Sequence, residues 1–148
     1  MKYLLIIIFT FSINLNSQDL QLRENYNSEL TSIIGSLASS NLYLSFMSID
    51  LLSKDIVKEE MTEKKKKRVL TSLNTINDQL ENNLKQLYSI AESDKDAKLI
   101  FDLVKLVQQL KLDNENLIKF VGSQSKLDLD AFNKSHKMVW ENLKKFYS

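Results

Sequence analysis

His136 is the one histidine of the chain, and most metal or acid–base chemistry would have to depend on it. Zinc sites draw on several His or Cys ligands, and di-iron bundles use Glu-x-x-His on two helices. The chain has no cysteine, which excludes disulfides, thiolate metal sites, iron–sulfur clusters and Cys nucleophiles. No serine lies in a Gly-x-Ser-x-Gly elbow, and no glycine-rich phosphate loop is present. These absences predict a protein that is not an enzyme.

His136 nevertheless lies on an apolar helical seam, where it could be an axial ligand to haem with a methionine opposite. The second ligand would come from Met47, Met61 or Met138. Met138 is two positions from His136 and faces elsewhere on the helix, whereas Met47 belongs to a long helix that can pass His136. The alternative is a seam histidine at a bundle edge that hydrogen-bonds a neighbour. In that case no cofactor is bound.

Two asparagines, Asn83 and Asn114, also occupy seam positions of their helices. A buried asparagine in a helical interface fixes register and oligomeric state at some cost in stability. The alternative is a seam that opens to solvent near the helix ends. Both readings stay open on the sequence alone.

A basic run, Lys64–Arg68, resembles a nucleic-acid-binding segment. Glu59, Glu60 and Glu63 flank it, and the chain carries a net charge of only +1. We therefore expect the run to be the solvated start of a helix. Neither nucleic acid nor a membrane surface is an expected partner.

The elements that position these residues must be helical. Proline is absent and glycine occurs twice, which deprives turn-rich sandwiches and barrels of their turn residues. With 43% hydrophobic and 26% charged residues, the chain has the composition of a folded protein. Its 148 residues suffice for one domain.

The N-terminus has the pattern of a secretory signal peptide. Lys2 precedes an apolar run from Tyr3 to Ile13, which is shorter than the roughly 20 residues that span a bilayer. Residues 1–17 are therefore expected to be a signal peptide, and residues 18–148 a single helical-bundle domain. The alternatives are a buried N-terminal helix and an uncleaved membrane anchor. The expected location is the periplasm or the extracellular space.

The first helix is expected to run from near Asp19 into the fifties, with two offset apolar stripes. The first stripe consists of Leu30, Ile33, Ile34, Leu37 and Leu44, and the second of Leu42, Phe46, Ile49, Leu52 and Ile56. Small residues over 35–41 favour a kink or a close helix approach, and we expect a kink. A hairpin is expected within residues 54–63.

Three further helices follow. The second begins near Thr62 and carries Val69, Leu73, Ile76, Leu80, Leu87 and Ile90 on its seam. The third begins after Ser93, carries Ile100, Leu103, Val107, Leu110, Asn114, Leu117 and Val121, and stops at Gly122. The fourth is capped by Asp128 and carries Leu129, Phe132, His136, Val139, Leu143 and Phe146. This pattern predicts an all-α, up-down-up-down four-helix bundle with a long, kinked first helix.

The functional expectation is binding without catalysis. The chain is expected to be an exported interaction or scaffold module of the cell envelope that binds another, unidentified protein. Its second stripe (Leu42, Phe46, Ile49 and Ile56) would allow a homodimer. The alternative is a small-ligand carrier that binds haem through His136.

Overall fold

The computed structural model describes the backbone of residues 20–58, 61–91 and 93–146, and the side chains of residues 32–55, 61–91 and 93–146. Within these residues the structure is all-helical. The helices are α1 (Leu20–Lys58), α2 (Glu63–Ser89), α3 (Asp94–Ser123) and α4 (Lys126–Leu143), and a short 3₁₀ turn, η1 (Lys144–Phe146), follows α4. The expected signal peptide, residues 1–17, lies outside the described residues.

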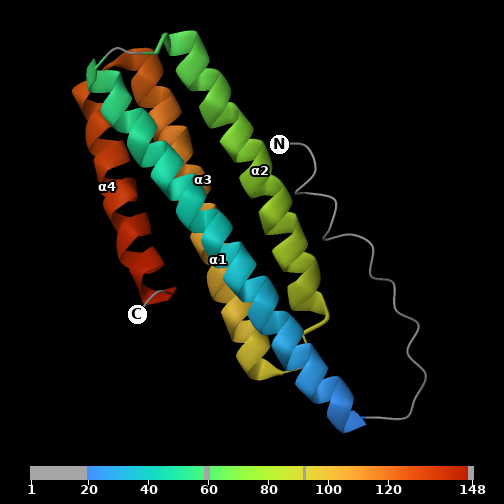
Figure 1. Cartoon of the computed structure of the whole chain (residues 1–148). Coiled ribbons are helices and arrows are strands. Elements are labelled where there is room, and N and C mark those ends of the chain that lie inside the picture. Colours follow the sequence, from blue (N-terminus) through green and yellow to red (C-terminus); the bar gives the residue numbers. More distant parts are fainter. Residues whose placement is uncertain (1–19, 59–60, 92, 147–148) are drawn as a thin grey trace.

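The helix α3 is the centre of the packing. It packs along α2, along α4 and, less extensively, along α1, whereas α1 has few contacts with α2 or α4. In Figure 1, α1 crosses in front of α3, and its first turns extend past the ends of the other helices. The expected four helices packed against each other, with a long first helix, are confirmed. No described helix is long and apolar enough to cross a membrane.

The starts of α2 and α3 agree with those predicted from the sequence. The α1 helix ends at Lys58 and α2 begins at Glu63, which places the connection inside the expected range 54–63. Thr62 caps α2 by accepting from the Lys65 amide, and Ser93 caps α3 by accepting from the Asp96 amide at 3.1 Å. Hydroxyl caps satisfy amides that a helix start leaves without a carbonyl partner.

The junction between α3 and α4 differs from the expectation. Gly122 does not stop α3; the helix continues to Ser123, and Gln124 takes the left-handed conformation with φ of 50°. The Gln124 amide donates to the Phe120 carbonyl at 2.8 Å, which closes the helix end. The expectation for Asp128 was also wrong, because Ser125 caps α4 by accepting from the Asp128 amide at 3.1 Å.

Asp128 completes this cap from the third helical position. Its carboxylate accepts from the hydroxyls of Ser123 and Ser125. These hydrogen bonds lower the pKa of Asp128 below its ordinary value, because they stabilise the ionised form. The acidic partner of the cap thus lies three residues after the hydroxyl, as in a capping box.

The stripe of α1 that is buried is the second one. Ala38, Leu42, Phe46, Ile49 and Leu52 lie in the core, so this stripe is not an exposed surface for a homodimer. Two residues of the first stripe, Ile33 and Leu44, have 57% and 62% of their surfaces exposed. The side chains of Leu30 and Ile56 lie outside the described residues. Periodicity had identified both stripes but could not decide which one faces the bundle.

The seam of α2 is likewise displaced. The residues that α2 buries are Lys66, Leu70, Asn77, Glu81 and Leu84. The expected seam residues Ile76 and Ile90 are exposed, and Val69, Leu73, Leu80 and Leu87 are half-buried. By contrast, every expected seam residue of α3 is buried. The difference follows from the packing, because α3 has neighbours along its length while α1 and α2 barely touch.

Gly35 brings α1 close to the first turns of α3. A Cβ at this position would lie 3.2 Å from the Leu99 Cδ2 atom, which is tighter than an ordinary carbon–carbon contact. The glycine therefore permits the close approach that its small-residue neighbourhood suggested.

Candidate functional site

His136 joins three helices through its two ring nitrogens. Its Nδ1 atom lies 2.8 Å from the Asp113 Oδ2 atom of α3, and its Nε2 atom lies 3.5 Å from the Asp50 Oδ1 atom of α1. Asp113 is fully buried, and the side chain of His136 is 18% exposed. His136 thus hydrogen-bonds a neighbouring side chain, as in the alternative to the haem hypothesis.

A serine and an asparagine extend this cluster. The Ser135 hydroxyl lies 2.7 Å from the Asp113 Oδ1 atom and 2.9 Å from the Phe132 carbonyl, so its proton goes to one of these acceptors. The Asn116 amide donates to the Ser135 hydroxyl at 3.1 Å. A nucleophilic serine would have to donate to a general base. The acceptors beside the Ser135 hydroxyl are the Asp113 carboxylate and the Phe132 carbonyl, an arrangement that ties α4 to α3.

Aromatic rings enclose the imidazole. The Phe46 ring stacks on it with centroids 4.4 Å apart and planes 12° apart, and the Phe132 ring lies at 5.0 Å. Phe46 also stacks with Trp140, with ring centroids 5.6 Å apart. The ring of His136 is therefore fixed in a slot between α1 and α4.

The haem hypothesis gains no support from this geometry. An axial ligand offers a ring nitrogen to iron, but Nε2 faces the Asp50 carboxylate and Nδ1 faces Asp113. Met47 and Met61 are half-buried against the core, and Met138 is exposed on α4. In the described part of the chain, no group of three or more His, Asp or Glu side chains could hold a metal ion.

A second polar cluster joins α2 and α3, and nothing in the sequence pointed to it. The buried Glu81 carboxylate accepts from Lys111 at 2.7 Å and from Gln108 at 2.9 Å, and Lys85 pairs with it at 2.6 Å. Hydrogen bonds to Lys111, Lys85 and Gln108 hold the pKa of Glu81 at about 2. Asp78 and Glu81 in turn raise the pKa of Lys111.

Of the two seam asparagines, Asn83 and Asn114, only Asn114 is buried. Asn114 is fully buried and donates at 2.6 Å both to the Leu70 carbonyl and to the Asn74 Oδ1 atom, so it ties α3 to α2. Asn83 is half-buried at the surface. The asparagine that the sequence did not single out is Asn77, which is fully buried with neither amide atom hydrogen-bonded.

The basic run is partly engaged within the molecule. Lys66 is buried and pairs with Asp55 at 3.3 Å across the α1–α2 connection, and Lys67 pairs with Glu63 at 2.6 Å. Lys64, Lys65 and Arg68 are exposed at the start of α2. The run is thus divided between one buried tie and a solvated helix start.

An apolar groove lies between α1 and α2. Its volume is about 440 Å³. It is lined by Ile34, Leu37, Ala38 and Asn41 of α1 and by Leu80, Asn83, Leu84, Gln86, Leu87, Ser89 and Ile90 of α2. None of these described residues is charged.

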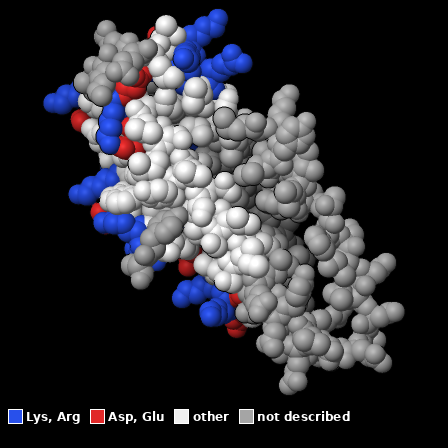
Figure 2. Space-filling model, in the orientation of Figure 1, with Lys and Arg blue, Asp and Glu red and all other residues white. Residues whose placement is uncertain are grey.

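Several aliphatic residues of both helices are exposed, and two of them, Leu37 and Ile90, line the groove. On α1 they are Ile33, Leu37, Leu44 and Leu51, and on α2 they are Ile76 and Ile90. We call these six residues together with the groove the α1–α2 face. In the part of Figure 2 that is not grey, the middle of the view is white, and most Lys, Arg, Asp and Glu atoms lie around it.

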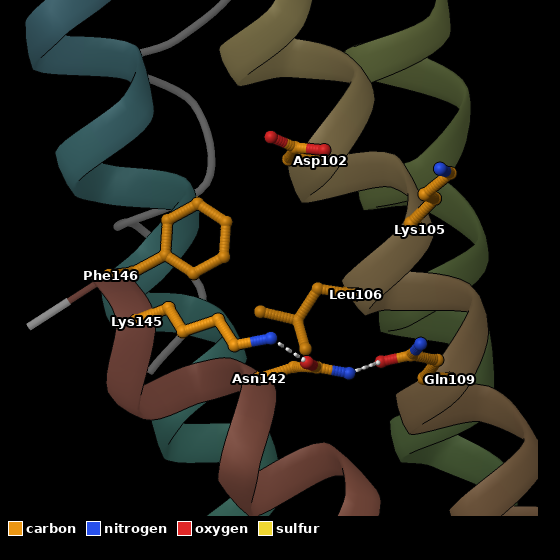
Figure 3. Close-up of a pocket in the computed structure, with 7 residues that line it drawn as sticks. All are labelled: Asp102, Lys105, Leu106, Gln109, Asn142, Lys145 and Phe146. Atoms are coloured by element: carbon orange, nitrogen blue, oxygen red, sulfur yellow. Dashed lines mark hydrogen bonds between the residues drawn. The ribbon is translucent and has the colours of Figure 1, made fainter.

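A second, polar pocket of about 370 Å³ lies between α3 and the end of α4 (Figure 3). Asn142 donates to the Gln109 Oε1 atom across its floor, and Lys145 donates to the Asn142 Oδ1 atom, each at 2.8 Å. Figure 3 shows Lys105 and Lys145 on opposite sides of the opening, with Asp102 near one end. These polar groups are widely spaced, and no shared orientation toward a reacting centre is visible.

Comparisons with protein-family models, with curated proteins and with solved structures give no match for this chain.

Proposed function

We propose that the chain is an exported helical-bundle protein that binds another protein through the α1–α2 face. The observation that carries the proposal is the exposure of Leu44 and Leu51, at 62% and 61%, on the helix that also lines an uncharged groove. Contiguous exposed apolar surface of this kind marks interaction sites. The N-terminal pattern of residues 1–17 supports export to the periplasm or the extracellular space.

The proposal includes the absence of catalysis. The polar partner of His136 on α3 is the carboxylate of Asp113. Ser135 is buried, and its hydroxyl faces the Asp113 carboxylate and the Phe132 carbonyl. These contacts suit a structural tie between helices. A scaffold or interaction role in the cell envelope follows from the face together with the export signal.

We also propose the finer architecture that the sequence predicted. Connections of a few residues between successive helices support the alternating up-down-up-down order. Small side chains at residues 35–41 support a kink in α1.

The groove itself favours one alternative function, the carriage of a small apolar molecule. Its volume of about 440 Å³ falls in the range of ligand sites, and its lining is mostly apolar. His136 is not among the lining residues, so such a carrier would not use the ligand that the haem hypothesis requires.

Site-specific photo-crosslinking in the native host tests the proposal. A photoreactive residue in place of Leu44 should give an adduct with a protein, and the same residue in place of Leu112 should not. Leu112 is the matched control because it is a leucine exposed on α3 and does not line the groove. Equal labelling from both positions, or no protein adduct from position 44, would contradict the proposal.

A further inference from the structure

The exposed leucines of α1 follow a seven-residue repeat. Leu37, Leu44 and Leu51 are seven residues apart, and Leu30 continues the repeat in the sequence. Ile33, which lies between Leu30 and Leu37 in the sequence, is also exposed. A sustained seven-residue spacing of leucine keeps one side of a helix against a second helix. No other described helix covers this side of α1 at Leu37, Leu44 and Leu51, which remain at least half exposed.

The exposed leucines Leu37, Leu44 and Leu51 form a ridge along α1, and the groove between α1 and α2 could receive a ridge of this kind. Leu37 belongs to both, because it carries the repeat and also lines the groove between α1 and α2. A two-fold interface uses one patch on both copies, so the patch has to be complementary to itself. A ridge directly beside a groove meets this requirement, since each copy can lay its ridge beside or into the groove of the other.

The absence of charge along this part of α1 favours an uncharged helix as the partner. Residues 32–49 contain no Asp, Glu, Lys or Arg. A partner that was recognised by charge would find no complementary group over this part of α1. An equally uncharged, leucine-bearing helix fits, and the chain itself supplies one.

The area is sufficient for a weak dimer. From Ile33 to Leu51 the helix rises about 27 Å, and two adjacent helices are about 20 Å wide, so the face covers about 500 Å². Two copies would together bury about 1,000 Å², which is the lower limit of specific interfaces.

We propose that a second copy of this chain docks on the α1–α2 face, with Leu37, Leu44 and Leu51 of each copy packed against the other. The proposal rests on the proposed function, because it names the occupant of the same face. Leu44 lies near the middle of the ridge and therefore near the two-fold axis, whichever way the two α1 helices run.

Sedimentation equilibrium of the purified full chain tests this assignment. The wild type should have twice the mass of the chain, with dissociation on dilution. The double substitution Leu44→Asp/Leu51→Asp should give the monomer mass, because four carboxylates would have to be buried in the dimer. Leu112→Asp, the control on α3, should stay dimeric. The wild type and both variants share residues 1–17, so association through that segment would persist in all three proteins.

The outcomes are separable. A monomeric wild type, or a double variant as dimeric as Leu112→Asp, overturns the second copy as the occupant. Far-ultraviolet circular dichroism identifies unfolding of the double variant, and Leu44→Asn then replaces it as a milder polar substitution with the same expected direction. If the wild type is monomeric while position 44 crosslinks a different protein, the proposed function stands and this inference fails. If position 44 crosslinks nothing, both fail.

Discussion

The carboxylate of Asp113 lies closer to a ring nitrogen of His136 than that of Asp50 does. Asp113 is fully buried, with one carboxylate oxygen 2.8 Å from His136 Nδ1 and the other 2.7 Å from the Ser135 hydroxyl, so its loss removes the polar contact that joins His136 to α3. Removal of one partner of a buried hydrogen bond typically costs about 1–3 kcal/mol, because the other partner stays desolvated.

Asp113→Ala should therefore lower the free energy of unfolding by about 1–3 kcal/mol. Denaturant titration followed by circular dichroism measures this loss. The control is Asp130→Ala, an aspartate exposed on α4, which should change the stability by about 0.5 kcal/mol or less. Equal effects of the two substitutions would show that the Asp113 cluster does not hold the helices.

Sequence reasoning found one side of this cluster only. His136 was recognisable because it interrupts an apolar seam, but Asp113 directly precedes the seam residue Asn114 and Asp50 lies on another helix. No spacing rule relates residues on three different helices. The haem hypothesis arose from that gap, since a lone seam histidine shows no partner in the sequence.

At the scale of the helix pair, Glu81 makes the stability of α2 against α3 sensitive to acid. Its pKa falls from an ordinary 4.5 to about 2 in the folded protein, so the unfolded chain takes up a proton first as the pH falls. The stabilisation is complete above a pH of about 4.5 and is lost as the pH approaches about 2. This shift corresponds to on the order of 3 kcal/mol.

Glu81→Gln should lower the free energy of unfolding at neutral pH, and the difference from the wild type should shrink steadily in acid. Chemical denaturation over a series of pH values measures it. Glu115→Gln, at an exposed position of α3, is the control for the general effect of charge. A difference that stays constant from neutral to acid pH would contradict the role of Glu81.

Asn77 should weaken the same helix pair. Both of its amide atoms are buried without a hydrogen bond, and such a group costs about 1–3 kcal/mol. Asn77→Leu should therefore raise the melting temperature, as measured by calorimetry. The same change at the exposed Asn82 should leave it nearly unchanged. A lower melting temperature for Asn77→Leu would indicate that the amide is satisfied in solution.

The helices themselves were largely predictable, and their faces were not. The seam of α3 was predicted completely because α3 has one apolar side and neighbours that bury it. The α1 helix has two apolar stripes, and periodicity ranks them equally. The burial of Leu42 and the exposure of Leu44 are decided by tertiary packing, specifically by where α1 can approach α3 beside Gly35.

For the whole molecule, the decisive feature is that α1 leans on α3 and leaves an opening toward α2. A closed bundle would bury the stripes of α1 and α2 against each other. In this structure Leu44, Leu51 and Ile76 stay exposed. Leu44 and Ile76, which the sequence placed on apolar stripes of their helices, are thus not part of the core.

Photo-crosslinking along α1 in the native host tests the proposed binding role of the α1–α2 face most directly. Photoreactive residues are placed in turn at Leu37, Leu44 and Leu51, which form the ridge, and at Ser36, an exposed residue outside it. Strong protein adducts from the three ridge positions, with little from position 36 or from Leu112 on α3, are the predicted result. Labelling that is uniform along α1, or absent at all ridge positions, would contradict a binding role for the α1–α2 face.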